Sequence, residues 1–364
     1  MQTYPIAKID LTALKHNLSR VKQLAPNSRV MSVVKANAYG HGAIEVANAL
    51  GESDAFAVAR LDEALRLRES GITKSIIILE GVNSEVDLHK AAEQSLSLVF
   101  HHDSQINLLI STQLTTPLSF CWLMVETGMH RLGLAVEKCE GALEQLSTSE
   151  NILGQVGLMS HFANADIIED PRNTQQLTQL KQLIPQNDIP TSMANSAAIL
   201  SYPASHGDWL RPGLMLYGIS PFEDQSAQDL DLKPVMRLQS QITAIQEIKV
   251  GNQVGYGGDW TAQQDTRIAI VSIGYGDGYS RQLSNTGRVV VDSELVNVIG
   301  RVSMDMIAID ITPLEHVNIG DEVTLWGNEQ LSVETVAEMA NTIPYELVCQ
   351  VSDRVIREYK DGKA

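Results

Sequence analysis

Short apolar runs alternate with amphipathic segments through the first two-thirds of the chain. Eight runs have the length and residue types of strands: 30–34, 55–58, 75–79, 96–100, 120–125, 156–160, 191–194 and 214–217. The clearest segments with helical spacing of apolar residues cover 11–24, 61–70, 85–93, 104–111 and 172–183. Strands that are apolar throughout are typical of a parallel sheet covered on both faces. Eight such units in about two hundred residues predict a (β/α)8 TIM barrel, an α/β fold.

A doubly wound open sheet is the alternative architecture for the same alternation. Its dinucleotide-binding form carries a Gly-x-Gly-x-x-Gly turn directly after a strand. None of the eight predicted strands is followed by such a turn. The sequence therefore favours the barrel.

The pattern changes after a polar segment at 223–233, which is followed by a proline and is typical of a linker. Runs with period-two alternation and glycine turns follow at 236–248, 267–273, 288–291, 296–299, 306–311 and 322–326, with one helix near 332–341. Such alternation predicts antiparallel strands. We expect a barrel domain at 1–232 and a mainly antiparallel β domain at 233–364. A first strand at about 5–10 could pair with the C-terminal domain.

Composition narrows the class of protein. A chain of 364 residues is too long for one hydrophobic core, in agreement with two domains. The net charge of −17 disfavours nucleic acid and anionic membranes as partners. Three widely spaced cysteines indicate neither a disulfide framework nor a zinc site, and we expect no metal. Because the chain shows no signal peptide and no long apolar span, we expect a cytoplasmic protein.

The segment 33–42, Val-Val-Lys-Ala-Asn-Ala-Tyr-Gly-His-Gly, contains the first candidate for chemistry. Lys35 ends an apolar run and begins a segment with so many small residues that we expect a loop and not a helix. Partial burial lowers the pKa of a lysine, and a neutral amine can attack a carbonyl to form a Schiff base. Taken alone, Lys35 would be better interpreted as a solvated charge at the end of a strand, but the flanking Asn, Tyr and Gly-His-Gly favour the chemical role.

Polar clusters follow other predicted strands, at 127–131, 161–164, 195–196 and 211–214. Each has a simple structural explanation, such as a helix cap or a surface charge. In a (β/α)8 barrel, however, the carboxyl ends of all strands lie on one face, where active sites form. The shared placement of these clusters predicts a common site.

Together these motifs resemble the alanine racemase family over essentially the whole chain. The resemblance rests on Val-Val-Lys35-Ala-Asn-Ala-Tyr39-Gly-His-Gly, Thr-Gly-Met-His-Arg131-Leu-Gly, Ser160-His161-Phe-Ala, Ala-Asn195-Ser196-Ala-Ala, Arg211-Pro-Gly-Leu-Met-Leu-Tyr-Gly, Val-Gly-Tyr256-Gly-Gly, Ile-Gly-Tyr-Gly-Asp-Gly-Tyr279 and Gly-Arg-Val-Ser-Met304-Asp305. It implies a pyridoxal 5'-phosphate-dependent isomerase with a barrel and a β domain. It also implies a homodimer that interconverts L-alanine and D-alanine and supplies D-alanine for peptidoglycan.

The resemblance assigns the proton transfers to two residues. Lys35 carries the cofactor as a Schiff base, and Tyr256 of the partner subunit acts on the opposite face of the external aldimine. Two bases on opposite faces are what racemisation requires, since one removes the α-proton and the other returns a proton from the far side. A phenol is a poor base unless its anion is stabilised, and His161 is its expected hydrogen-bond partner.

The resemblance also assigns binding roles. Arg211 is expected to face the pyridine nitrogen, where a group that only donates hydrogen bonds keeps the nitrogen unprotonated and disfavours transamination. Arg131 and the backbone N–H of Met304 from the partner subunit are expected to hold the substrate carboxylate. The phosphate is expected at a helix N-terminus and among nearby donors, supplied by Tyr39, Asn195, Ser196, Gly213 and Leu214.

Two positions depart from the family pattern. Many members carry a carbamylated lysine that orients the carboxylate-binding arginine, and Met124 occupies that position here. Arg131 then needs another partner, which could be a bound anion, a water or Glu126. Some members carry a phosphate-contacting tyrosine at the position of Asp353, so that the mouth of the site could be wider here and admit serine.

Other functions remain open from the sequence. A racemase of broader or serine-preferring specificity shares every motif named above. A decarboxylase that uses the same cofactor would place an acidic residue, not Arg211, at the pyridine nitrogen. A barrel that only carries the cofactor would need neither Tyr256 nor a β-rich second domain. A metal-dependent aldolase would need a ligand cluster, which the second domain lacks in its sequence.

Overall fold

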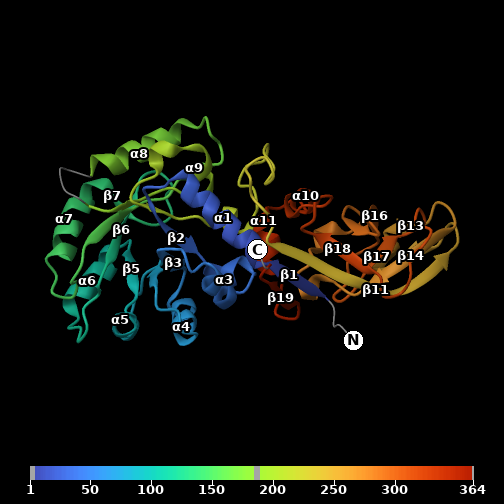
Figure 1. Cartoon of the computed structure of the whole chain (residues 1–364), viewed down its shortest axis with the longest axis horizontal. Coiled ribbons are helices and arrows are strands. Elements are labelled where there is room, and N and C mark those ends of the chain that lie inside the picture. The colour runs from blue at the N-terminus through green and yellow to red at the C-terminus, as the bar shows by residue number, and fades with distance from the viewer. Residues whose placement is uncertain (1–4, 184–188, 363–364) are drawn as a thin grey trace.

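The structure is a computed structural model that describes residues 5–183 and 189–362. Figure 1 shows a barrel and a β-rich domain side by side along the long axis. Within the described residues, eight parallel strands form the barrel, in the ring order β2 (Arg29–Val33), β3 (Ala55–Val58), β4 (Ser75–Ile78), β5 (Ser97–Phe100), β6 (Cys121–Glu126), β8 (Val156–Met159), β9 (Thr191–Ser192) and β10 (Trp209–Leu210). β10 pairs with β2 and closes the ring, and the short β7 (Leu134–Ala135) is added to β6. The predicted barrel is confirmed.

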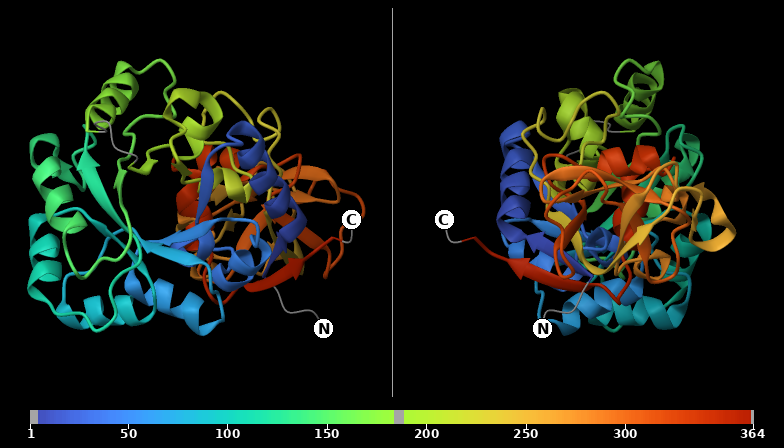
Figure 2. Two further views of the ribbon diagram at one scale, coloured as in Figure 1. Left: turned by 60° about the vertical axis from the view of Figure 1, so that its left-hand side comes forward. Right: turned by 90° about the vertical axis from the view of Figure 1, so that its right-hand side faces the viewer.

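Helices surround the barrel (Figure 2). α1 (Leu11–Leu24) precedes β2, and the others follow barrel strands in sequence: α3 (Ala43–Ala49), α4 (Leu61–Glu69), α5 (Glu85–Glu93), α6 (Asp103–Ser111), α7 (Val136–Ser147), α8 (Pro171–Gln182) and α9 (Ser196–Ser201). Side-chain caps explain where several of them begin. The Asp10 carboxylate accepts hydrogen bonds from the N–H groups of Thr12 and Ala13 at 2.8 and 2.9 Å and so starts α1. Ser84 caps α5 in the same way.

The eighth predicted strand was placed wrongly. The run at 214–217 is a 3₁₀ helix (Leu214–Tyr217), and β10 at Trp209–Leu210 is the eighth strand. The run is apolar because all four of its side chains are buried, and Asn17 of α1 donates to the Leu216 carbonyl at 3.0 Å. A short buried run has no period that separates a strand from a helical turn. Only the preceding Pro212 and Gly213 hint that the strand has already ended.

The C-terminal sheet is mainly antiparallel, as predicted. Its strand order is β14 (Thr266–Val271), β17 (Ile307–Asp310), β16 (Glu294–Ile299), β15 (Arg288–Val291), β18 (Glu322–Trp326) and β11 (Met236–Ile248). β14 also pairs with β11, so these six described strands close on themselves, while β12 (Gln253–Val254) and β13 (Trp260–Thr261) form a separate hairpin. The single helix expected near 332–341 is instead followed by a second: α10 (Val333–Met339) and α11 (Pro344–Gln350).

The first strand of the chain belongs to this C-terminal sheet. β1 (Ile6–Asp10) pairs with β11 in antiparallel and with β19 (Ile356–Lys360) in parallel orientation. From β1 onward the chain therefore leaves the C-terminal sheet, builds the barrel, and returns to that sheet. The division of the chain at residue 232 stays a prediction.

Gly40 is one point where the barrel domain packs tightly against the C-terminal domain. Its φ of +79° lies in the left-handed region, and a Cβ there would stand 2.0 Å from the carbonyl oxygen of Val348 in α11. The guanidinium of Arg357 donates to the Gly40 carbonyl at 2.7 Å and also to that of Val351 at 2.9 Å. The loop that follows Lys35 is thus packed directly on α11.

We predict that Gly40→Ala destabilises the protein by about 2 kcal/mol or more, because it adds backbone strain and a clash with main chain that cannot move freely. Gly141→Ala is the matched control, since Gly141 lies in α7 and a Cβ there meets nothing within 4 Å. That control should be neutral or stabilise by about 0.5–1 kcal/mol. Denaturant unfolding of both variants measures the difference, and equal stability of the two would contradict the interface described.

Candidate active site

A cavity of about 530 Å³ opens at the carboxyl ends of the barrel strands. This volume is in the range of small-molecule sites. Its lining includes all nine site residues that the sequence predicted from the barrel: Lys35, Tyr39, Arg131, His161, Asn195, Ser196, Arg211, Gly213 and Leu214. Their convergence places the predicted strand-end clusters in one site. The two predicted site residues of the second domain, Tyr256 and Met304, do not line this cavity.

Lys35 projects into this cavity from the end of β2. Burial, and then the charge of Arg131, lower the pKa of Lys35 from its ordinary value of 10.5, although Glu63 and Glu80 act in the opposite direction. The neutral form of the amine is therefore easier to reach than in water. This is the property that attack on an aldehyde requires.

The residues after Lys35 form a left-handed turn instead of an open loop. Ala36, Asn37, Ala38 and Tyr39 have φ between +51° and +54°, a conformation that costs a non-glycine residue about 1–2 kcal/mol. Hydrogen bonds from the rest of the barrel hold the turn in place. Glu63 of α4 accepts the Ala36 N–H at 2.6 Å, and the buried His41 ring binds the Tyr39 carbonyl at 2.8 Å. Backbone strain of this kind is typical of functional sites.

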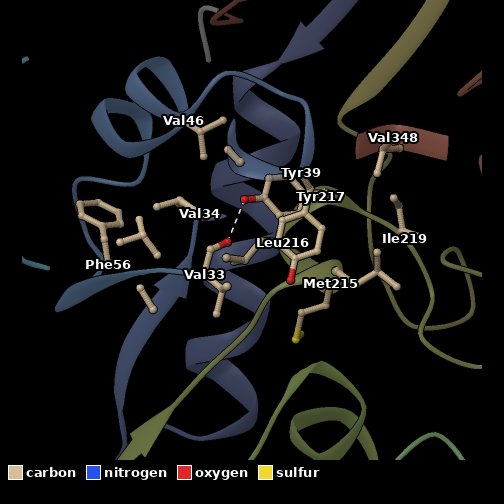
Figure 3. Packing of buried hydrophobic residues seen from close by; sticks show 14 of the residues in the cluster. Val33, Val34, Tyr39, Val46, Phe56, Met215, Leu216, Tyr217, Ile219 and Val348 are labelled. Atoms are coloured by element: carbon tan, nitrogen blue, oxygen red, sulfur yellow. Dashed lines mark hydrogen bonds between the residues drawn. The ribbon is translucent and has the colours of Figure 1, made fainter. Parts of the chain in front are cut away.

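Tyr39 ends the turn and forms one wall of a polar recess. Its ring stacks on that of Tyr217 with centroids 4.8 Å apart, and the Tyr217 hydroxyl donates to the Val33 carbonyl at 2.9 Å (Figure 3). A Cβ on Gly213 would stand 2.6 Å from the Tyr39 hydroxyl. The Ser196 hydroxyl accepts the N–H of Gly213 at 2.9 Å. Hydroxyl and backbone N–H groups thus meet in one recess that only a glycine leaves open.

Arg211 is held by three acceptors at the ends of two barrel strands, β8 and β9. Its guanidinium donates to the Ser192 hydroxyl at 2.7 Å, to the Met193 carbonyl at 3.3 Å and to the Ser160 carbonyl. Burial, and then the charge of Arg131, lower the pKa of Arg211 to about 9, which leaves it a cation at neutral pH. Its position and charge are therefore both fixed by the barrel.

His161 lies beside Arg211 and is neutral. The Arg211 guanidinium is 3.2 Å from His161 Nδ1. Because arginine only donates hydrogen bonds, Nδ1 accepts and the proton of the neutral ring sits on Nε2. Burial, and then the charges of Arg211, Arg131 and Lys35, lower the pKa of His161 well below 6.5. His161 thus offers an N–H donor to a further group.

Tyr256 and Met304 are exposed on the C-terminal domain, with 73% and 51% of their surfaces accessible. They lie on neighbouring loops that an ion pair joins, since Arg301 contacts Asp259. A Cβ on Gly257, next to Tyr256, would stand 2.7 Å from the guanidinium carbon of Arg301. The two residues are thus presented together, but not to the cavity of their own chain.

Sequence reasoning missed some residues of the cavity wall. Tyr345 and Cys349 of α11 line it, and the Tyr345 ring is 5.9 Å from that of Tyr39. No motif indicated them, because they reach the cavity only through the packing of α11 on the barrel. Met124 lines the cavity and is 9% exposed. Asp353 is exposed, and the neighbouring Arg354 pairs with Asp277 and Asp305.

Comparison with known proteins identifies the family. The model for "Alanine racemase, N-terminal domain" matches residues 9–221, and that for "Alanine racemase, C-terminal domain" matches residues 235–359. The chain belongs to the alanine racemase family. Members from Legionella pneumophila and Vibrio cholerae are 47% and 46% identical, over 95% and 97% of this chain and 97% of each relative.

Solved structures of the family have the same fold. The biosynthetic alanine racemase from Pseudomonas aeruginosa superimposes with a TM-score of 0.94 at 41% identity, covering 99% of this chain and 100% of that one. The alanine racemase from Acinetobacter baumannii gives 0.91 at 44% identity with the same coverage. Among the residues that the structure describes, no helix is long and apolar enough to cross a membrane, and no group of three or more His, Cys, Asp or Glu side chains is placed to hold a metal.

Proposed function

We propose that this protein interconverts L-alanine and D-alanine with pyridoxal 5'-phosphate bound at Lys35. One observation carries the proposal: an amine whose pKa is lowered shares a single cavity with a recess of hydroxyl and N–H donors and with a buried arginine. An aldehyde, a phosphate and a pyridine nitrogen are complementary to these three features. Membership of the alanine racemase family supports the same reaction.

The residues present fit the cofactor. Lys35 would bind its aldehyde, and Tyr39, Ser196 and the N–H groups of Gly213 and Leu214 would hold its phosphate at the start of α9, which Asn195 caps. Arg211 would face the ring nitrogen as a donor, which disfavours protonation of that nitrogen. An acidic residue at this point, as in the decarboxylase alternative, would have the opposite effect. When bound, the cofactor supplies an electron-withdrawing system that makes the α-proton of the amino acid acidic.

Two groups of the protein would move the α-proton. The Lys35 amine serves one face of the substrate. Tyr256 of the partner subunit serves the other, with its oxygen hydrogen-bonded to the N–H at His161 Nε2, because Nδ1 is occupied by Arg211. That donor would stabilise the phenolate, which is the basic form of tyrosine.

The role proposed for Tyr256 of the partner subunit implies a homodimer in which the two chains share each active site. In a single chain Lys35 lines the cavity but Tyr256 does not, while Tyr256 and Met304 are exposed on adjoining loops. In a twofold dimer each chain would complete the cavity of its partner. Arg131 and the N–H of Met304 from the partner subunit would then hold the substrate carboxylate.

D-alanine is a component of peptidoglycan, so we expect a role in cell-wall synthesis. A catabolic role would use the same residues and the same reaction. The cytoplasm stays the predicted location.

We predict that two inactive variants restore activity when mixed. Lys35→Ala and Tyr256→Phe should each lose nearly all racemisation. In a mixed dimer, one site combines the intact Lys35 of one chain with the intact Tyr256 of the other. Random reassociation should therefore recover about a quarter of the parental activity. Mixing Lys35→Ala with a Lys35→Ala/Tyr256→Phe double variant is the control and should recover none. Failure of the first mixture to regain activity would rule out sharing of Tyr256.

Substrate choice separates the proposal from its alternative, a racemase of broader or serine-preferring specificity. Apolar side chains such as Leu79, Met124 and Met159 line part of the cavity. A buried hydroxyl without a partner costs about 1–3 kcal/mol, so we expect kcat/KM for L-alanine to exceed that for L-serine by about tenfold or more. D-isomer formation from each substrate measures this. Equal values, or a preference for serine, would favour the alternative.

A further inference from the structure

Glu126 stands at the end of β6, at the start of the loop that carries Arg131. Its carboxylate accepts backbone N–H groups from three residues of that loop: Gly128, His130 and Arg131, the last at 3.3 Å. The side chain is 19% exposed. One partly buried anion thus binds three main-chain donors within five residues.

The backbone conformation of the loop is suited to binding such an anion. Gly128 and His130 have φ of +128° and +56°, and His130 is not a glycine. Left-handed residues turn successive N–H groups toward the same point and form a concave site for negative charge. Burial alone would raise the pKa of Glu126, but the three N–H groups together hold it below its ordinary value. The loop therefore contains its own counter-ion.

The guanidinium of Arg131 has no such support. Within residues 5–183 and 189–362, no carboxylate forms a hydrogen bond or ion pair with this guanidinium. Met124, at the position where the family pattern has a lysine in many members, is a thioether without a charge to pair with a cation. Arg131 nevertheless lines the cavity, and its charge lowers the pKa values of Lys35, His161 and Arg211 there. Its direction must then be set through the main chain.

We infer that Glu126 is a positioning residue for the substrate carboxylate, acting through the backbone of the loop that carries Arg131. The inference rests on the proposed function, in which Arg131 binds that carboxylate. The sequence left an anion, a water or Glu126 as possible partners of Arg131, and the inference selects Glu126. It also specifies that Glu126 acts on the main chain of the loop and not on the guanidinium.

The start of the loop is anchored independently of Glu126. The Thr127 hydroxyl hydrogen-bonds to that of Ser160 at 2.7 Å, and the buried Gln176 donates to Thr127 at 3.3 Å and to the His161 carbonyl at 3.0 Å. A substitution at Glu126 should therefore release residues 128–131 and leave the barrel folded.

The test is Glu126→Gln in the cofactor-loaded protein, because glutamine keeps the shape but lacks the charge and directs a donor at the N–H groups. KM for L-alanine should rise roughly tenfold, the range expected for hydrogen bonds to a charged group, while kcat changes much less. The dissociation constant of propanoate, a carboxylate without an amino group, should rise to a similar extent in calorimetry. Binding of isopropylamine, an amine without a carboxylate, should stay unchanged in absorbance titrations.

Controls separate positioning from a general loss of structure. Glu126→Asp should recover part of the propanoate affinity, and Glu140→Gln, on the exposed face of α7, should change nothing. Adding Glu126→Gln to Arg131→Ala should weaken propanoate no further than Arg131→Ala alone, because the two residues act as a unit.

Three results would overturn the inference: unchanged KM and propanoate affinity in Glu126→Gln, equal weakening of propanoate and isopropylamine, or additive effects in the double variant. If the parent protein did not racemise alanine, the proposed function would fail. The propanoate measurements would then still decide whether Glu126 acts through Arg131.

Discussion

In the proposed function the site depends on one constraint, an amine that must lose its charge in a cavity that also holds two arginines. Lys35 shares the cavity with Arg131 and Arg211, inside a chain whose net charge is −17. Burial and the charge of Arg131 favour the neutral amine and outweigh the opposite effect of Glu63 and Glu80. The same cations suit a ligand that is anionic at its phosphate and its carboxylate. In the proposed function, the positive charge of the two arginines would therefore favour both the neutral amine and the anionic ligands.

Much of this arrangement is maintained through the main chain. Glu63 holds the N–H of Ala36 at the strained turn, Glu126 holds the loop of Arg131, and Arg357 holds the carbonyl of Gly40. Each is a charged side chain bound to backbone groups that no helix or strand satisfies. Charged hydrogen bonds of this kind fix loops more firmly than packing of small side chains does. The reactive groups can then sit on loops and still be rigidly placed.

The sequence predicts the parts of this molecule that follow from periodicity. Apolar runs locate seven of the barrel strands, and polar residues at their ends locate Lys35, Arg131 and His161 in one site. It cannot separate the buried 3₁₀ helix at Leu214–Tyr217 from a strand, because both are short and apolar. It cannot reveal Tyr345 either, whose place in the wall depends on contacts between α11 and the barrel. The left-handed turn arises from contacts with Glu63 and His41, and small residues only permit it.

The central claim is that the amine of Lys35 carries the aldehyde cofactor. Reduction of the cofactor-loaded protein with borohydride, followed by digestion and mass spectrometry of the peptides, tests it most directly. The account predicts a single pyridoxyl phosphate adduct per chain, on Lys35, and no adduct at this peptide in Lys35→Ala. An adduct on another lysine, or a fully active protein that yields none, would contradict it.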